Sequence, residues 1–464
     1  MLIFNLKDKI IIIGIILLIF PLVILFNNIE YSSYRYLLLI VFTPIFLFLS
    51  LNFKIISSLF IVSLFLDFGF YYFSVSEIVS ILLLISFLLT YKFKVTEIKN
   101  SQSLFFGVFV LSILPSYTLL LNNIEALSLG LHLVLFIIVI EVFSIAIKSY
   151  KQLKYYFIIF SIIALFNSFD VIVSAFYSGK RAFGFAGIMF VDYVGYALVI
   201  SFVTFIYKKK YRIKAFIFFS IFSFALVYTQ TRSIWIVISV TILFIVFHVL
   251  VNRKLYEISL KNSMLVFSSL ILILSILFIS FKQFNSNIGE RLEIRKIEQT
   301  DDPNRLMIQI NSFVTRYFIW TTAWNAFESS PIIGIGFYGF PFLSQNYSDL
   351  DPFIYESFVK KLTPHETFLA VLTEGGIVGL FGFLLFLIHS FIYSWKSIRV
   401  SFTPEQKFYS LLIFWLTIYT YLSMIITDAW LWGHGLMLWS ILIAFSIGNR
   451  KILSIKQNDN LILS

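Results

Sequence analysis

Long apolar segments recur along almost the whole chain, and most of them are separated by short polar connections. Segments of about 17 to 25 residues are long enough to cross roughly 30 Å of hydrocarbon as helices. Because lipid offers backbone groups no hydrogen-bond partner, such segments must be helical. We predict an all-α fold, a polytopic membrane helix bundle of about 14 transmembrane helices, within a single integral membrane domain over residues 1–464. The predicted spans are 8–26, 35–51, 54–73, 76–92, 102–121, 126–148, 153–176, 188–207, 213–229, 233–251, 263–281, 366–393, 406–426 and 431–448.

Composition and charge agree with a membrane protein. Hydrophobic residues make up 59% of the chain and charged residues 13%, which excludes a soluble domain. Of the 22 cations on short connections, 18 fall on one set of alternating connections and four, including Arg181 and Arg232, on the other. The positive-inside rule then places both termini in the cytoplasm. The net charge of +11 therefore reflects topology and predicts no nucleic-acid partner.

One long polar loop, residues 282–365, is predicted on the outer face. Within it, residues 311–329 have the spacing of a helix that carries five aromatic residues on one face. Trp and Tyr are suited to the headgroup level of a bilayer, so we expect an interfacial helix. The aromatic residues are Phe313, Tyr317, Trp320, Trp324 and Phe327.

Three arginines are predicted at the outer face. Arg232 lies in a connection so tight that its guanidinium must sit at the membrane edge, Arg316 lies on the loop helix, and Arg181 follows Gly179-Lys180. Taken singly, each is equally explained as an interfacial or loop charge. Together, guanidinium groups that bind phosphate oxygens bidentately would suit a lipid-linked pyrophosphate.

The triplet Pro364-His365-Glu366 stands where the long loop enters the next apolar segment. A histidine titrates near pH 6.5 and can take a proton from a sugar hydroxyl, and the adjacent Glu366 carboxylate could orient it or share the work. His434, at the outer end of the last span, is a weaker second candidate. His132, His248 and His389 are better explained by packing or by positions at span edges.

Other polar motifs in the sequence give little support for transport, dinucleotide binding or metal binding. Carboxylates in or near spans raise the possibility of ion or proton translocation, but only Glu141 has a buried position, so a relay is poorly supported. Gly334 to Gly339 spells GxGxxG without the βαβ context of a dinucleotide site. The sequence contains no clustered metal-ligand set and no cysteine, so we predict no metal and no other cofactor. The carboxylates are Asp67, Glu141, Asp170 and Asp192.

Four patterns, in this order, resemble a known family. They are Arg181 to Gly184; Thr231-Arg232-Ser233; Arg316 with Trp320, Ala323 and Pro331 to Gly336; and Pro364-His365 followed by Glu374 to Gly379. The chain resembles the superfamily of O-antigen ligases and Wzy-type O-antigen polymerases, membrane glycosyltransferases of bacterial surface polysaccharides. His365, Gly376 and Gly379 match the spacing of the ligase signature, whereas Glu366 stands where that signature has Asn, Ser or Gln.

The resemblance implies a GT-C-like bundle and a metal-independent glycosyl transfer at the outer face of the cytoplasmic membrane. It implies that Arg232 and Arg316 hold the pyrophosphate of an undecaprenyl-linked glycan donor and that His365 lies where the acceptor hydroxyl is activated. Arg181, Trp320, Trp324 and His434 are the expected substrate-binding residues.

Three functions stay open at this point. The first is a polymerase that adds a growing glycan to the next lipid-linked repeat unit, with a flippase and a chain-length regulator as possible partners. The second is a ligase that transfers the glycan to lipid A core or another terminal acceptor. The third, from another class, is a polysaccharide flippase or transporter. Glu366 and the number of spans favour the polymerase slightly.

Overall fold

The computed structural model describes residues 52–65, 69–70, 73–90, 101–120, 124–178, 182–229, 231–252, 312–431 and 433–463. The predicted spans 8–26, 35–51 and 263–281 lie outside these residues. Each of the other predicted spans overlaps a helix. Seven helical segments in the described part are long and apolar enough to cross a membrane, which confirms the all-α polytopic bundle.

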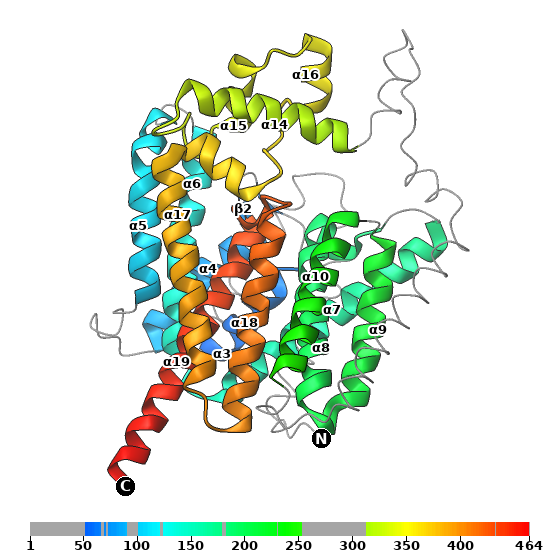
Figure 1. Ribbon diagram of the computed structural model, residues 1–464, viewed down its shortest axis with the longest axis vertical. Helices are drawn as coiled ribbons and strands as arrows, with labels where there is room; N and C mark the ends of the chain where they lie inside the picture. The colour runs from blue at the N-terminus through cyan, green and yellow to red at the C-terminus, as the bar shows by residue number, and fades with distance from the viewer. Residues whose placement is uncertain are drawn as a thin grey trace.

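Bundle helices that a short connection joins run in opposite directions (Figure 1). Two of the first described helices, α3 and α4, have 11 and 16 residues and are shorter than a helix that crosses a bilayer on its own. A short 3-10 helix, η2 (Thr118–Leu120), follows α5, and η4 (Lys209–Tyr211) precedes α9. The helices are α3 (Phe53–Ser63), α4 (Val75–Thr90), α5 (Ser101–Tyr117), α6 (Ile124–Ala146), α7 (Tyr150–Ser178), α8 (Phe190–Tyr207), α9 (Arg212–Tyr228), α10 (Arg232–Val251), α17 (Thr367–Arg399), α18 (Pro404–Met424) and α19 (Gly433–Leu463).

The predicted span 54–73 is wrong in its second half. Helix α3 ends at Ser63, and two short antiparallel strands follow, β1 (Gly69–Phe70) and β2 (Phe73–Ser74). The segment from 67 to 73 combines Asp and Gly, which are poor helix formers, with aromatic residues that favour strands. An apolar run thus continues here while the helix does not.

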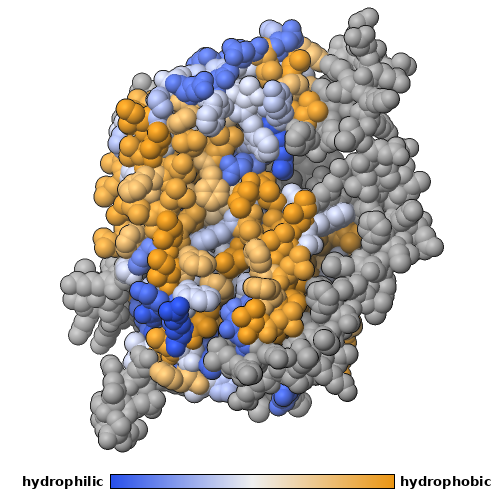
Figure 2. Space-filling view, in the orientation of Figure 1, coloured by the Kyte–Doolittle hydropathy of each residue, from blue (hydrophilic) through white to orange (hydrophobic). Residues whose placement is uncertain are grey.

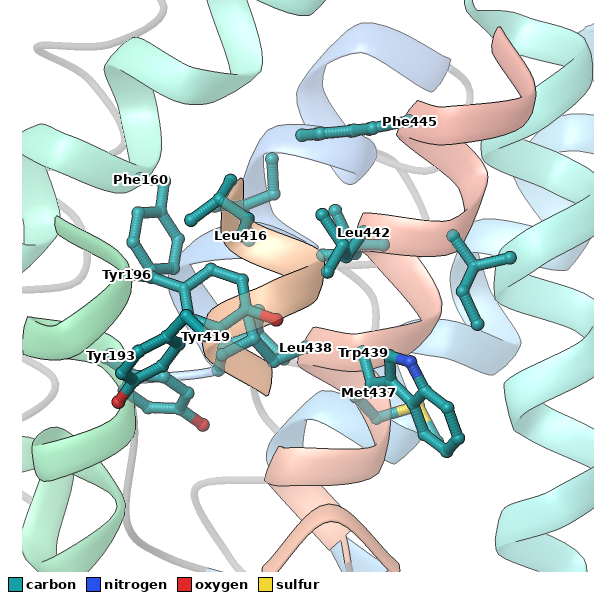
Figure 3. Close-up of a cluster of buried hydrophobic side chains, with 14 of the residues drawn as sticks. Phe160, Tyr193, Tyr196, Leu416, Tyr419, Met437, Leu438, Trp439, Leu442 and Phe445 are labelled. Atoms are coloured by element: carbon teal, nitrogen blue, oxygen red, sulfur yellow. The ribbon is translucent and has the colours of Figure 1, made fainter. Parts of the chain in front are cut away.

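The core of the bundle is aromatic where α7, α8, α18 and α19 meet (Figure 3). The Tyr196 hydroxyl and Thr420 Oγ1 lie 2.6 Å apart, and the rings of Tyr196 and Tyr419 pack edge to face at 5.5 Å. Gly195 makes room for this packing, since a Cβ there would lie 2.0 Å from the Tyr419 hydroxyl. These contacts fix α18 against α8.

The side of the bundle seen in Figure 2 carries an apolar band, with hydrophobic residues over the bundle helices. Helix α17 packs against α5 and α18, and its lipid-facing positions are exposed apolar residues, among them Ile377, Phe381 and Ile388. More hydrophilic surface lies above and below the band. This is the surface of a protein that spans a bilayer.

A layer of shorter helices crosses one end of the bundle, opposite the end of α19 (Figure 1). The predicted interfacial helix is present as α14, but its buried positions include Ile319, Ala323 and Ala326 rather than the aromatic face. Tyr317 and Trp324 are 60% and 48% exposed. The small alanine side chains let α14 lie close to its neighbours on this face, while Tyr317 and Trp324 point outward. The layer consists of α14 (Ser312–Ser329), α15 (Phe340–Leu343), η5 (Ser344–Tyr347) and α16 (Pro352–Phe358).

Candidate active site

The start of α17 holds His365 in a constrained backbone conformation. Glu366 is the N-cap of the helix, and its carboxylate accepts the backbone N–H groups of Phe368, at 3.0 Å, and of Leu369. His365 then takes a φ of +57°, a left-handed conformation that few residues other than glycine adopt. Such strain persists where surrounding contacts enforce it, and it is common at functional sites.

Asp428 supplies the enforcing contact. It follows α18 and precedes η6 (Ala429–Leu431), and it is only 5% exposed. Its Oδ2 accepts the backbone N–H of His365 at 2.9 Å, and its Oδ1 lies 3.9 Å from His365 Nδ1. Next to it, Thr367 Oγ1 donates to the Thr427 carbonyl. The His365 side chain is 39% exposed, so a substrate can still reach it.

Arg316, on α14, lies near enough to Asp428 for their charges to interact. Burial lowers the pKa of its guanidinium, and the negative charge of Asp428 partly offsets that effect. Since arginine titrates far above physiological pH, the group remains charged. Asp428 therefore joins Arg316 and His365, two of the predicted catalytic residues, in one electrostatic site.

The Glu366 carboxylate mainly contacts backbone N–H groups at the start of α17. Burial raises the pKa of its carboxyl, the N–H groups of Leu369 and Phe368 oppose that shift, and the charge of Asp428 adds to it. Its oxygens cap α17, whereas the carboxylate that contacts His365 belongs to Asp428. A catalytic role for Glu366 stays a prediction.

The two predicted tryptophans have different surroundings. Trp320 Nε1 donates to the Pro364 carbonyl at 3.1 Å, immediately before His365. Trp324 is exposed and donates to Glu328 on its own helix at 2.7 Å. Trp320 thus belongs to the framework of the site, while Trp324 packs against Phe327 and is about half exposed on the layer of α14.

The glycine-rich segment docks on α17. Gly376 has a φ of +64° at a kink in α17, and the turn segment from Pro331 to Gly336 packs against it. Ile335 N–H donates to the Thr373 carbonyl at 3.1 Å, and Ile377 N–H donates to the Pro331 carbonyl at 2.9 Å. A Cβ on Gly376 would lie 2.3 Å from the Ile332 carbonyl oxygen. The glycines therefore serve close backbone packing.

The backbone places Arg232 at the same end of the bundle. Helix α10 runs antiparallel to α18 (Figure 1), and the His248 and Trp415 rings lie 5.4 Å apart. At 1.5 Å per residue, Arg232 lies about 24 Å along the axis from His248, whereas α18 extends only about 14 Å beyond Trp415. Arg232 therefore begins α10 beyond the last turn of α18, on the side where Asp428 follows.

Three predicted residues cannot be placed fully. The side chains of Arg232 and His434 and the whole of Arg181 lie outside what the structure describes. Ala182 N–H donates to the Tyr228 carbonyl at 3.4 Å, so the chain leaving Arg181 passes the end of α9, four residues before Arg232. Convergence of these side chains on His365 stays a prediction.

Asp428 was not among the residues predicted from the sequence. Two carboxylates that were considered there have hydroxyl partners: Ser423 donates to Asp192 at 3.2 Å, and Ser103 donates to Glu141. Asp428 lies in the connection between two spans, as Arg232 does, and the same argument from a tight outer connection could have found it. Within the described ranges, no group of three or more His, Cys, Asp or Glu could hold a metal ion.

The central part of the chain is similar to a known protein family. Residues 216–384 match the family model described as O-antigen ligase. The matched range includes Arg232, Arg316 and His365 and ends before Asp428. No curated protein matches the chain. The match confirms the resemblance that the sequence motifs predicted.

Proposed function

Because residues 216–384 match the O-antigen ligase family model and the chain is a multi-pass membrane protein, we propose that this protein is a polysaccharide polymerase. It transfers a growing glycan from undecaprenyl pyrophosphate to the next lipid-linked repeat unit. The observation that supports this proposal is that Asp428 contacts His365 and interacts electrostatically with Arg316 at one end of the helix bundle.

The arginines bind the leaving group. A guanidinium presents a planar fork of donors that matches phosphate oxygens. Arg316 is half-buried, and charge interactions strengthen where water is excluded. Arg232, which begins α10 at the same end of the bundle, supplies the second guanidinium. Together they stabilise the negative charge that develops on the pyrophosphate, so the transfer requires no metal ion.

His365 acts as the general base. Its Nε2 takes the proton of the acceptor hydroxyl as that oxygen attacks the anomeric carbon of the donor sugar. The bond between that carbon and the pyrophosphate oxygen breaks, and the pyrophosphate leaves with the electron pair. The Asp428 carboxylate orients the imidazole and stabilises the imidazolium that forms.

The remaining predicted residues bind the glycan and the lipid. The exposed ring of Trp324 gives a sugar a stacking surface on α14, and Trp320 fixes the start of α17 beside the reacting groups. We assign Arg181, in the α7–α8 connection, and His434, near the start of α19, to substrate binding as well.

The site faces away from the cytoplasm in this proposal. The end of α19 lies opposite the layer of α14 and α16 (Figure 1). The cations Lys396, Arg399 and Lys407 lie at the α17–α18 connection, at the end away from His365. By the positive-inside rule that end is cytoplasmic, together with both termini.

A ligase is the alternative that a specific observation favours, since the matching family model is itself described as O-antigen ligase. The ligase and the polymerase would share the glycan donor, the general base and the two arginines, and they would differ only in the acceptor. The transporter alternative receives less support, because Glu141 and Asp192 accept bonds from serine hydroxyls in separate parts of the bundle.

The test is product formation by reconstituted protein supplied with an undecaprenyl-pyrophosphate glycan, read as a ladder on a gel. We expect Arg232→Ala and Arg316→Ala to abolish the ladder, His365→Ala to reduce it severely, and chelator to leave the wild-type ladder intact. Arg399→Ala, at the other end of α17, is the control and should retain activity. Wild-type ladders from both site arginine variants would refute the proposal. A single addition to a lipid A core acceptor, without a ladder, would favour the ligase.

A further inference from the structure

Tyr338 links the glycine-rich segment to the site. It is fully buried and has a φ of +65°, and its hydroxyl donates to the Leu431 carbonyl at 2.7 Å. Leu431 closes η6, and its N–H donates to the Asp428 carbonyl at 2.9 Å. The tyrosine hydroxyl therefore holds the far end of the short turn that begins at Asp428.

Glu374 fixes Tyr338 from the other side. This buried carboxylate on α17 accepts the N–H groups of Tyr338, at 2.9 Å, and of Phe340, at 3.1 Å. The Glu374 carbonyl accepts the N–H of Gly336 at 3.1 Å. The backbone of Tyr338 is thus attached to α17 by its own N–H and by those of neighbouring residues, and its side chain has a defined direction.

His365 lies two residues before α17, and Glu374 lies within the first turns of that helix. The segment from Asp428 to Leu431 is therefore held at the start of α17 twice: directly, through the His365 N–H, and indirectly, through Glu374 and Tyr338. We propose that Tyr338 is a positioning residue that holds η6 so that the Asp428 carboxylate stays beside His365. This inference rests on the proposed function, in which Asp428 orients the base.

The hydroxyl is suited to this task. Burial raises the pKa of Tyr338 well above its ordinary value, and the carboxylates of Glu374 and Glu77 raise it further. The group therefore remains a protonated donor at any working pH. A charged donor in its place would add a buried charge near Glu374, whereas Phe would leave the Leu431 carbonyl without this donor.

The experiment is a single-turnover assay on reconstituted protein, with enzyme in excess over a fluorescent lipid-linked donor. Tyr338→Phe keeps the ring and removes the hydroxyl. We expect its rate constant to fall about tenfold, the usual effect of one lost hydrogen bond, while donor affinity stays unchanged. A merely structural role would lower the fraction of protein that reacts, seen as the amplitude, and leave the rate constant unchanged.

Two matched variants sharpen the result. Tyr355 is a buried tyrosine of the outer layer whose hydroxyl lies 3.0 Å from Ser344 Oγ, so Tyr355→Phe removes a comparable bond and should leave the rate constant unchanged. Tyr338→4-aminophenylalanine retains a donor at the same point and should restore most of the rate. If Tyr338→Phe does not fold, Tyr338→4-methylphenylalanine, which fills the hydroxyl volume without donating, takes its place.

The inference is overturned if the rate constant is unchanged in Tyr338→Phe, or in the 4-methylphenylalanine variant that replaces it. It is also overturned if Tyr338→4-aminophenylalanine does not recover the rate. These outcomes differ from failure of the proposed function. If Arg316→Ala and His365→Ala abolish transfer while Tyr338→Phe does not slow it, only the positioning role is lost. If Arg316→Ala and His365→Ala keep wild-type transfer, the proposed function itself fails.

Discussion

Asp428 accepts the backbone N–H of His365 at 2.9 Å and places its second carboxylate oxygen 3.9 Å from the Nδ1 atom of the same residue. One buried carboxylate thus both supports the strained backbone of His365 and lies beside its ring. A residue that only supported the backbone could be replaced by any acceptor, whereas a residue that stabilises an imidazolium must carry charge.

Asp428→Asn separates these two roles, because the amide oxygen can still accept the His365 N–H. We expect kcat to fall about a hundredfold or more, the usual range for loss of acid–base assistance. Asp349→Asn, at an exposed carboxylate that accepts a bond from Asn325, should leave kcat unchanged. Wild-type kcat in Asp428→Asn would restrict Asp428 to a structural role.

Arg316→Lys tests whether the guanidinium fork matters beyond its charge. Lysine is a point charge that cannot bind two phosphate oxygens in parallel, so we expect a loss of about tenfold in kcat/KM, and about a hundredfold or more for Arg316→Ala. Transfer rates are measured against the concentration of lipid-linked donor. Arg399→Lys, at the cytoplasmic end of α17, is the matched control. Equal activity of the Arg316 lysine variant and the wild type would show that charge alone suffices.

Much of the bundle was predictable because lipid imposes one solution on a long apolar segment. The position of His365 at the entry to a helix followed from Pro364 and from the apolar run after it. The end of α3 at Ser63 was not predictable from hydropathy, since the aromatic residues beyond it are apolar too. Hydropathy reports burial in lipid, whereas a helix end depends on local propensity.

The site was predictable only in part. His365 and Arg316 stand out as polar groups at predicted outer positions, but the contact between His365 and Asp428 joins residues 63 positions apart and depends on how α17 packs beside α18. The helix α14 was predicted from its spacing, but not which of its residues pack against the rest of the protein. The small residues Ala323 and Ala326 are among those that do.

Gly376→Ala tests the docking of the glycine-rich segment on α17. The new Cβ would lie 2.3 Å from the Ile332 carbonyl oxygen at a residue whose φ is +64°, so backbone must shift. We expect the free energy of unfolding to fall by about 3 kcal/mol. Gly107→Ala, where nothing lies within 4 Å, should be neutral or stabilising by up to about 1 kcal/mol. Thermal unfolding followed by tryptophan fluorescence measures both, and equal melting temperatures would contradict the docking role.

Glu366→Gln tests the electrostatic cost of the buried cap. Burial holds the pKa of Glu366 above its usual 4.5 in the folded protein, although two backbone N–H groups oppose this. The folded state therefore binds this proton more tightly than the unfolded chain does. The stability that the protonated group contributes is fully present below the unfolded pKa and is lost as pH rises through the folded pKa.

The glutamine variant retains an acceptor for the cap and does not titrate. The melting temperature of the wild type, relative to Glu366→Gln, should therefore decline as the pH is raised from about 4 towards neutrality, through the raised folded pKa. Glu328→Gln, at an exposed carboxylate on α14, should follow the wild-type profile. If the melting temperature of the wild type instead rises with pH relative to Glu366→Gln, the N–H groups of Phe368 and Leu369 outweigh burial in setting the pKa. Glu366 would then be a fully ionised cap beside Asp428.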